Sequence, residues 1–418
     1  MRASGHMLAL LLALIAAGAA TADGGAGIAL RADGRGVNDR GPLALAASLQ
    51  AGIAPPTPSG QALQAELRHV LRLAAGLSLQ TNALLAHERP AGGSGRDASR
   101  LNELHAAWDL GAWQLAAGKK VLGWDVGYGY RPNDVVQQEA RRVQFGQTPA
   151  GRPLLMAEHF DADTAWTLVA VQPGRWPDDV DRQRGAREAA LAGRMYRRLG
   201  ALDLHGFARH GRHTGASAGL ALAWVATDEL ALHTSARAFR RHDGWAMAAD
   251  ATTLASSNPW RQAMRGGGTQ WLVGGQWTGG PNLSLLTEAW HDGSALSDEA
   301  WRRWGARNAA LAALATQPAR RRAAAGNLAW QASPLDAPNL RRDNLYLRLA
   351  WQPTDWTLSI DALVTPADRG QVVSAALQWR GDRWRVDASL RLFGGPADAV
   401  LAQLPLRRSL VLAATLGF

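Results

Sequence analysis

The chain has 418 residues, no cysteine and a formal net charge of +10 at pH 7. The lack of cysteine excludes a disulfide framework, thiolate chemistry and a cysteine-ligated metal. A basic balance attracts phosphate, but Lys119 and Lys120 are the only lysines among 45 basic residues. We therefore attribute the arginine excess partly to a GC-rich codon bias and expect no nucleic-acid partner.

The N-terminus has the pattern of a secretory signal. Arg2 supplies a positive charge, residues 8–20 are apolar, and Ala20-Thr21-Ala22 is a small-residue cleavage site. We predict a signal peptide over residues 1–22 and one domain over 23–418. No later run reaches the roughly eighteen apolar residues that a membrane helix needs, so the exported chain is either soluble or a β-barrel.

Segments of about ten residues with alternating apolar side chains recur after the signal, as barrel strands do. They predict an up-and-down antiparallel transmembrane β-barrel of 18 strands, with 16 as the alternative. The predicted strands are 42–52, 61–73, 77–88, 99–109, 112–123, 152–159, 164–172, 187–198, 200–210, 213–225, 229–239, 269–278, 282–292, 341–352, 355–364, 369–380, 383–393 and 407–418.

Connection lengths alternate along this series. Every second connection is a short turn, such as 74–76, 111, 161–163 or 353–354. The connections between them include the longer segments 124–151, 173–186, 240–268, 293–340 and 394–406. Outer-membrane barrels have short periplasmic turns and long extracellular loops, so we assign the two sets accordingly.

Tryptophans flank the short turns. Trp108 and Trp113 lie on either side of Gly111, and Trp351 and Trp356 on either side of the 353–354 turn. They predict an aromatic girdle at the periplasmic membrane interface.

The C-terminus points the same way. Residues 409–418 place Leu410, Leu412, Ala414, Leu416 and Phe418 on one face of a strand. A terminal strand that ends on an aromatic resembles those of bacterial outer-membrane barrels. The resemblance implies an outer-membrane location, with the barrel-assembly machinery, membrane lipid and lipopolysaccharide as partners. A soluble edge strand is the alternative.

The long connection 293–340 contains a predicted helix, capped near Ser297 and running through Trp301, Trp304 and Leu311 towards Arg320. We favour a solvated loop helix. The alternative is a helix folded into the pore or packed on acidic lipopolysaccharide through its arginines.

Alternation also predicts which side chains face the lumen. The inward set is rich in arginine, which favours an anionic or polyhydroxylated solute; the alternative is that these arginines pair with acids and only stiffen the wall. The candidate pore-lining residues are Arg68, Arg72, Arg194, Arg209, Arg237, Arg348, Arg383, Arg385 and Arg391, with Glu288 and Asp361 as counter-charges.

Catalytic patterns are weak. His210 and His213 lack a third metal ligand in register, and we expect no metal, no cofactor and no enzyme activity. His242-Asp243 and His291-Asp292 lie at the predicted rim and leave open an outer-membrane hydrolase with a rim active site. A non-transporting surface barrel that binds a partner through loops 240–268 and 293–340 is a further alternative.

One segment carries a family resemblance. Gly118, Lys119, Trp124, Asp125 and the run 131–134 (Arg-Pro-Asn-Asp) resemble an element of outer-membrane barrels related to the alginate-export proteins. Those proteins have Trp-Gly where this chain has Trp124-Asp125. The resemblance covers about a tenth of the chain, and it implies an 18-stranded barrel with inward-folded loops and a basic conduit for anionic solutes or polysaccharide.

The same segment is glycine-rich, but it precedes no helix and has no Lys-Ser/Thr pair after the loop, so it does not match a phosphate-binding loop. We predict instead that it forms a constriction element at the pore mouth. The residues assigned to this element are Lys120, Trp124, Asp125, Arg131 and Asp134. The sequence as a whole predicts a passive outer-membrane channel.

Overall fold

The structure, a computed structural model, describes residues 24–53, 59–138, 149–172 and 188–417. The predicted signal peptide, the connection 173–186 and the terminal Phe418 lie outside these residues.

Eighteen antiparallel strands form one closed sheet, because β1 pairs with both β2 and β20. This confirms the predicted barrel and its strand number. The barrel strands are β1 (Gly24–Val37), β2 (Gly60–Ala74), β3 (Leu77–Pro90), β4 (Arg96–Asp109), β5 (Trp113–Lys120), β6 (Arg152–Phe160), β7 (Thr164–Val171), β8 (Ala190–Leu199), β9 (Leu202–Gly211), β10 (Gly215–Val225), β11 (Leu230–Phe239), β14 (Gly268–Gly279), β15 (Leu283–Asp292), β16 (Asp343–Trp351), β17 (Trp356–Thr365), β18 (Gly370–Arg380), β19 (Trp384–Gly394) and β20 (Leu406–Gly417).

The first strand was predicted in the wrong place. Residues 42–52 do not form a strand, because Pro42–Leu49 is the helix α2, with a proline in its first turn and helix-forming leucine and alanine along its length. The first strand is instead β1, whose sequence GGAGIALRADGRGV contains five glycines. Glycine weakens an alternation pattern because it has no side chain to place on either face.

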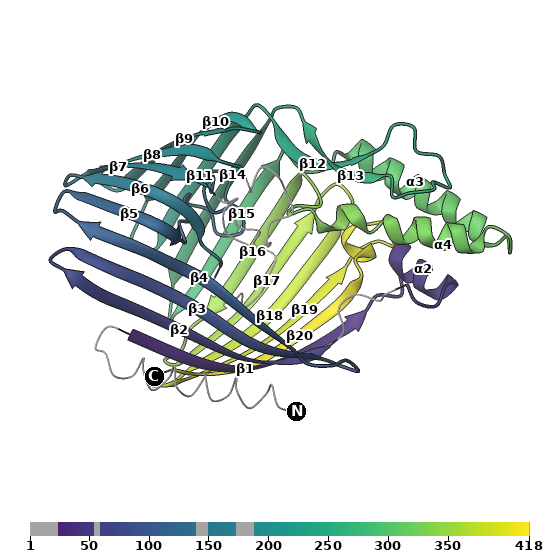
Figure 1. Cartoon of the computed structure of the whole chain (residues 1–418), viewed down its shortest axis with the longest axis horizontal. Coiled ribbons are helices and arrows are strands. Elements are labelled where there is room, and N and C mark those ends of the chain that lie inside the picture. Colours follow the sequence, from purple (N-terminus) through teal and green to yellow (C-terminus); the bar gives the residue numbers. More distant parts are fainter. Residues whose placement is uncertain (1–23, 54–58, 139–148, 173–187, 418) are drawn as a thin grey trace.

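The short turns gather at one end of the barrel and the long connections at the other (Figure 1). Tryptophans beside the short turns are exposed on the outer surface, among them Trp108, Trp113, Trp351 and Trp384. Between the two ends, outward apolar side chains such as Leu220 are exposed. An apolar band with an aromatic girdle is the outer surface of a transmembrane barrel.

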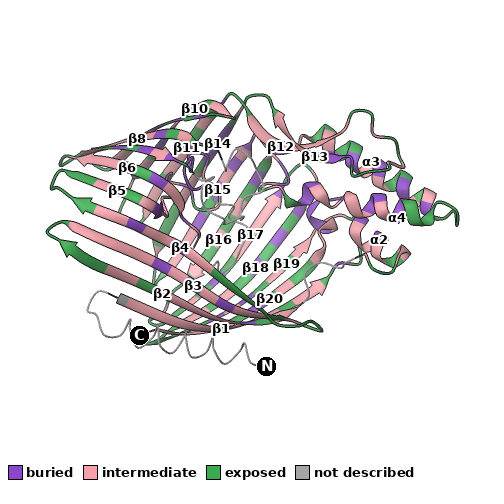
Figure 2. Cartoon of the chain, in the orientation of Figure 1, coloured by how far each residue is buried: buried purple, intermediate pink, exposed green. Residues whose placement is uncertain are grey.

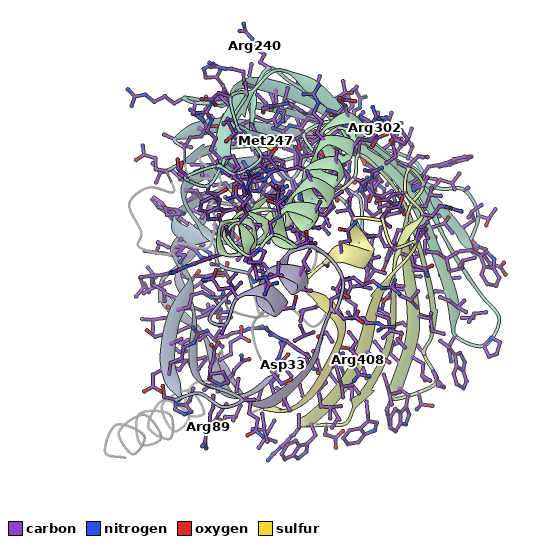
Figure 3. All side chains as sticks on the ribbon, turned by 90° about the vertical axis from the view of Figure 1, so that its right-hand side faces the viewer. Asp33, Arg89, Arg240, Met247, Arg302 and Arg408 are labelled. Carbon is purple, nitrogen blue, oxygen red and sulfur yellow. The ribbon has the colours of Figure 1, made fainter. Side chains whose placement is uncertain are left out.

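Four of the long connections, those between β1 and β2, β11 and β14, β15 and β16, and β19 and β20, form a second layer, here called the cap, beyond the right-hand end of the barrel in Figure 1. Seen from that side, its helices lie across the barrel opening (Figure 3). Besides α2, the cap contains the hairpin β12 (His242–Met247) and β13 (Trp260–Arg265), the helices α3 (Asp298–Ala315) and α4 (Arg321–Trp330), and the 3-10 turns η3 (Ser333–Asp336) and η4 (Leu401–Gln403).

Helix α3 begins where the sequence predicted, with Ser297 Oγ accepting a hydrogen bond from the Ala300 amide at 3.2 Å. The predicted loop helix lies in the cap with one side exposed, but its other side is buried rather than solvated (Figure 2). Trp301 and Trp304 are almost fully buried, and their indole nitrogens donate to Leu340 O at 2.6 Å and to Gln331 O at 2.8 Å. Since α4 and α2 also pack here, the cap has an apolar core of its own.

Across the described ranges, no helix combines the length and apolar character required to span a membrane.

Candidate functional site

Residues 121–138, here called the inner loop, leave β5 and fold into the barrel. Trp124, Val135 and Val136 of this loop are buried in an apolar cluster with inward side chains of β5 to β10. Burial of this apolar surface favours the folded-in loop, and it fills one side of the lumen. The wall residues of the cluster are Ala116, Leu154, Met156, Val169, Val171, Ala192, Phe207 and Ala221.

A buried polar contact holds the base of the inner loop to β10 and β11. Asp125 Oδ2 accepts hydrogen bonds from the Asn133 amide at 2.6 Å and from Ser235 Oγ at 2.8 Å. The side-chain amide of Asn133 donates to Ser235 Oγ at 2.9 Å and to Ala236 O at 3.1 Å. Gly219 leaves the space for this side chain, since a Cβ there would overlap Asn133 Oδ1.

Replacing Gly219 with alanine is expected to displace the inner loop from β10. The added Cβ would also lie 2.5 Å from Ala236 O, and overpacking of this kind costs about 1–3 kcal/mol. Urea unfolding should show a loss of that size in the free energy of unfolding. Gly206→Ala, whose Cβ would meet its nearest atoms at 3.9 Å, is the control; equal stability of the two variants would contradict this role.

The tip of the inner loop is hydrogen-bonded to a buried carboxylate on β15, on the far wall. Glu288 accepts hydrogen bonds from the backbone amides of Tyr128 at 2.7 Å and Gly129 at 2.6 Å. His233 Nε2 lies 2.8 Å from the same carboxylate. Gly274 makes room for this pair, because a Cβ there would lie 2.6 Å from His233 Nε2 and 2.7 Å from Glu288 Cγ.

Tyr128 also joins the inner loop to β16. Its hydroxyl is hydrogen-bonded to Arg348, whose guanidinium carbon lies 5.3 Å from the centre of the Tyr128 ring. Arg348 lies 3.6 Å from Asp361, and the hydroxyl of Tyr346 donates to Asp361 at 2.8 Å. The inner loop therefore reaches across the lumen from β5 to β16.

Arginines recur along one row of the opposite wall. Arg391 Nε donates to Ser374 Oγ at 3.3 Å. Directly paired residues on neighbouring strands form a continuous row, and three arginines line this part of the wall. Two residues of the row separate Arg348 from Arg391, and one separates Arg391 from Arg35. In order from β16 to β1, the row is Arg348, Asp361, Ser374, Arg391, Ser409 and Arg35.

Other inward arginines are paired with a carboxylate two residues away on the same strand. Residues i and i+2 share a face of a strand, so each pair lies in the lumen; Asp33 is labelled in Figure 3. Pairing leaves this part of the wall polar but closer to neutral than its arginine content suggests. The pairs are Arg31–Asp33 at 2.9 Å, Arg68–Glu66 at 3.0 Å and Arg385–Asp387 at 2.9 Å.

Several predicted pore-lining residues lie on the filled side of the barrel. Arg209 is buried and pairs with Glu188 at 2.8 Å, and Arg237 donates to Ser217 Oγ at 3.1 Å. The Arg194 guanidinium lies 5.9 Å from the centre of the Tyr196 ring. Glu288 holds the inner loop, so it is not an open counter-charge in the lumen.

The remaining predicted pore-lining residues have simpler positions. Arg72 is exposed near the end of β2, and Arg383 lies in the short turn that precedes β19. Arg68, Arg348, Arg385, Arg391 and Asp361 lie on the polar walls described above.

The structure places the predicted constriction residues in or beside the inner loop. Lys120 Nζ lies 3.3 Å from His105 Nε2 on the wall. Trp124 is buried against the wall, and Asp125 accepts a hydrogen bond from Ser235 of β11. Arg131 Nε donates to Gly127 O at 2.8 Å, and Asp134 Oδ1 accepts from the Trp124 amide at 3.3 Å. Both contacts lie within the loop and shape it.

Sequence reasoning gave no role to Tyr128, Gly219 or Gly274. A glycine inside a strand is a signal of close backbone approach, so Gly219 and Gly274 mark where another segment contacts the wall. That signal does not say which segment, and no sequence pattern ties Tyr128 to Arg348.

A second buried charge lies at the rim between β8 and β10. Glu188 accepts hydrogen bonds from the backbone amides of His213 and Thr214 and from the Thr214 hydroxyl. It also forms an ion pair with Arg209. Although burial favours its protonated form, these hydrogen bonds and the Arg209 charge hold the pKa of Glu188 below its ordinary value. A carboxylate with a lowered pKa stabilises the folded state above the ordinary pKa of about 4.3, and this contribution is lost as the pH falls through the lower, folded value.

Removal of the Glu188 carboxylate is expected to weaken the rim. Glu188→Ala leaves Arg209 buried without its partner, which costs about 3 kcal/mol at neutral pH. The difference in the free energy of unfolding between the variant and the natural chain should shrink as the pH is lowered to about 3, because Glu188 of the natural chain is then increasingly protonated. Urea unfolding at both pH values measures it. Glu299→Ala, which removes an exposed ion pair, should unfold like the natural chain; an equal loss in both variants would argue against this assignment.

Three rim histidines contact an acid or a carbonyl oxygen of another segment. In the part of the chain that the structure describes, no group of three or more His, Cys, Asp or Glu could hold a metal ion. His213 Nε2 lies 3.0 Å from Asp243, His242 Nδ1 lies 3.0 Å from Gly266 O, and His291 pairs with Asp343 at 2.7 Å.

The closed barrel, its apolar outer band and its folded-in loop define a transmembrane β-barrel of the bacterial outer membrane. No protein-family model and no curated protein matches the sequence. The fold is similar to that of Acinetobacter baumannii OccAB1, with a TM-score of 0.56, 10% identity, and 95% of this chain and 96% of that chain covered.

Pseudomonas aeruginosa OccK5 (OpdH) matches with a TM-score of 0.55 and 12% identity over 95% of this chain and 98% of that chain. P. aeruginosa OccD3 (OpdP) matches with a TM-score of 0.53 and 8% identity over 94% of this chain and 91% of that chain. At these identities the likenesses concern the fold alone.

Proposed function

We propose that this protein is an outer-membrane channel through which a hydrophilic, anionic solute passes by diffusion, without covalent chemistry or a cofactor. The observation that carries the proposal is the unequal division of the lumen. The inner loop and an apolar cluster fill the side of β5 to β10. The polar row that contains Arg348, Arg391 and Arg35 lies on the opposite wall.

The charges along this row support an anionic solute. The six positions of the row contain three arginines and one carboxylate, that of Asp361. The carboxylates of the inner loop and its socket, such as Asp125 and Glu288, are engaged by amides of the loop. A conduit lined by an excess of arginine raises the local concentration of anions and offers bidentate contacts to carboxylate or phosphate.

The relation to alginate-export proteins remains a prediction from residues 118–134. The inward-folded loop that the resemblance implied is present in this chain. OccAB1, OccK5 and OccD3 are not described as alginate-export proteins. Polysaccharide export is thus a narrower form of the proposal, with a carboxylated chain as the solute.

Planar bilayers test the channel directly. Purified protein should produce stepwise ionic currents, and liposomes that contain it should swell in small hydrophilic solutes. A protein that inserts but conducts no ions would contradict the proposal. The natural chain and a variant with His242 and His291 replaced are also assayed for hydrolysis of lipid and peptide. If only the natural chain is active, the protein is a rim hydrolase and the channel proposal is contradicted.

A further inference from the structure

Three consecutive arginines lie where α3 gives way to α4. Arg320, Arg321 and Arg322 are exposed, and the start of α4 is close to the outermost point of the cap (Figure 1). They lie on the side of the barrel opposite the short turns. A solute that approaches the channel from outside the cell therefore reaches the cap before it reaches the lumen.

The three arginines differ from their neighbours in their partners. Arg302 and Arg303 of α3 both pair with Glu299, at 2.6 Å and 2.8 Å. Arg321 Nε donates to Ala315 O at 3.5 Å. Among the residues that the structure describes, no carboxylate pairs with any of the three.

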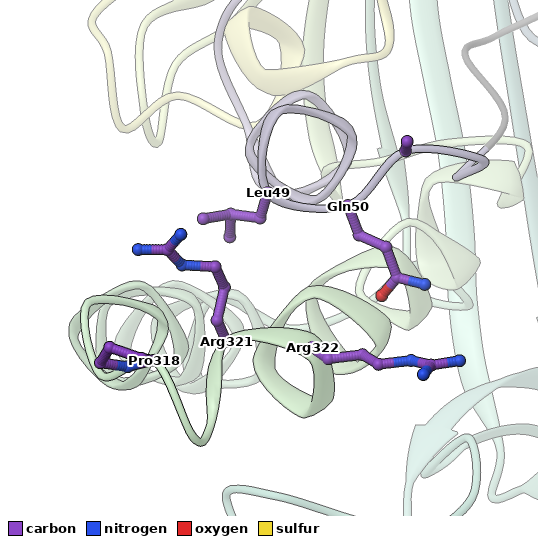
Figure 4. A pocket seen from close by; sticks show the side chains of 6 residues that line it. Leu49, Gln50, Pro318, Arg321 and Arg322 are labelled. Atoms are coloured by element: carbon purple, nitrogen blue, oxygen red, sulfur yellow. The ribbon is translucent and has the colours of Figure 1, made fainter.

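A pocket of about 440 Å³ lies beside this cluster, between α2 and α4 (Figure 4). Ligand sites commonly have volumes of about 300–1,000 Å³. Its lining combines two arginine side chains, one side-chain amide and a small apolar surface. Arg321 and Arg322 extend in different directions from the start of α4 (Figure 4), so they offer separate contacts to a chain that carries several anionic groups. The lining residues are Leu49, Gln50, Ala51, Pro318, Arg321 and Arg322.

The backbone adds to the positive potential. Arg321 and Arg322 begin α4, whose first turn contains no acidic residue and whose N-cap side chain forms no capping hydrogen bond. Cations are unfavourable at this end of a helix. A bound anion would offset both the dipole and the mutual repulsion of the arginines.

We propose that Arg320, Arg321 and Arg322, with the adjoining pocket, form an outer capture site for a polyanion, a chain that carries several carboxylate, sulfate or phosphate groups. The site deepens the proposed channel function and rests on it. One end of the chain binds at the cap while another enters the arginine row of the lumen. Binding of one group at the cap raises the effective concentration of the linked groups at the lumen row. A polyanion therefore binds more tightly than a single small anion does.

The test compares two variants that each remove two charges from the cap. Arg320→Gln combined with Arg322→Gln leaves the Arg321 contact intact, and Arg302→Gln combined with Arg303→Gln removes arginines that already have a partner. A short dextran sulfate is added on the cap side of planar bilayers, and the rate of current blocks is recorded. At low salt, dextran sulfate is expected to block the first variant at a rate about tenfold lower than that of the natural chain. The second should block at the natural rate.

Equal block rates in the natural chain and the Arg320/Arg322 variant would overturn the proposal. Binding of fluorescent dextran sulfate to detergent-solubilised protein gives a readout that needs no conduction, and the same variant should weaken it. If vesicles of lipopolysaccharide bind through these arginines while dextran sulfate does not, the patch contacts lipid and the capture site is also overturned. If the natural chain binds dextran sulfate but produces no channel currents, the result would instead count against the proposed function.

Discussion

Replacing Glu288 with alanine is expected to release the tip of the inner loop and enlarge the conducting pathway. Glu288 accepts two backbone amides of the loop, and hydrogen bonds to a charged group are each worth about 1.5–3 kcal/mol. Loss of both, about 3–6 kcal/mol in total, corresponds to a shift of at least roughly 100-fold from the held to the released loop. Single-channel recordings should show a higher unit conductance and larger current fluctuations.

Glu158 provides the matched control for this variant. Its carboxylate lies on the inward face of β6 and accepts the Thr167 hydroxyl at 2.6 Å. Glu158→Ala removes the same charge from the lumen wall but takes no contact from the loop. If the two variants conduct alike, the effect is one of charge, and Glu288 does not hold the loop.

Reversing the charge of Arg391 and Arg35 together is expected to abolish any preference for anions. At an effective dielectric constant of about 20, a unit charge about 10 Å from the path contributes roughly 1.7 kcal/mol before screening. Each Arg→Glu change alters the charge by two units and acts oppositely on chloride and potassium, so even with screening at about 0.1 M salt it should lower the chloride-to-potassium permeability ratio by more than about tenfold. Reversal potentials measure this ratio.

Arg89→Glu is the control for the charge reversal. Arg89 is exposed and lies directly opposite Gln61, on the outward face of β3. Arg89→Glu makes the same charge change per residue without facing the lumen, so selectivity should stay close to that of the natural chain. The effect of the lumen variant should also shrink at about 1 M salt, where screening is strong. An equal effect of both variants would argue against the arginine row.

The strands and turns were predictable because each depends on local patterns. Alternation marks a strand, and the short turns and their tryptophans mark one membrane interface. The pattern failed at β1, where glycines remove the alternating side chains, and at 42–52, where leucine and alanine in a helix imitate it.

The candidate site was predictable only in part, because its contacts join segments far apart in the chain. Tyr128 and Glu288 are 160 residues apart. Alternation placed Arg209 and Arg391 on the inward face alike. It could not show that Arg209 is buried with Glu188 or that Arg391 lies in the arginine row, since that difference depends on where the inner loop folds.

The most direct test of the account is the reversal potential of the natural channel in a tenfold gradient of potassium chloride at low ionic strength. Chloride should cross faster than potassium if the arginine row lines the conducting path. The dilute side is then expected to be negative when the current is zero. A dilute side that is positive at zero current would show a cation-selective channel and would contradict the proposed anionic pathway.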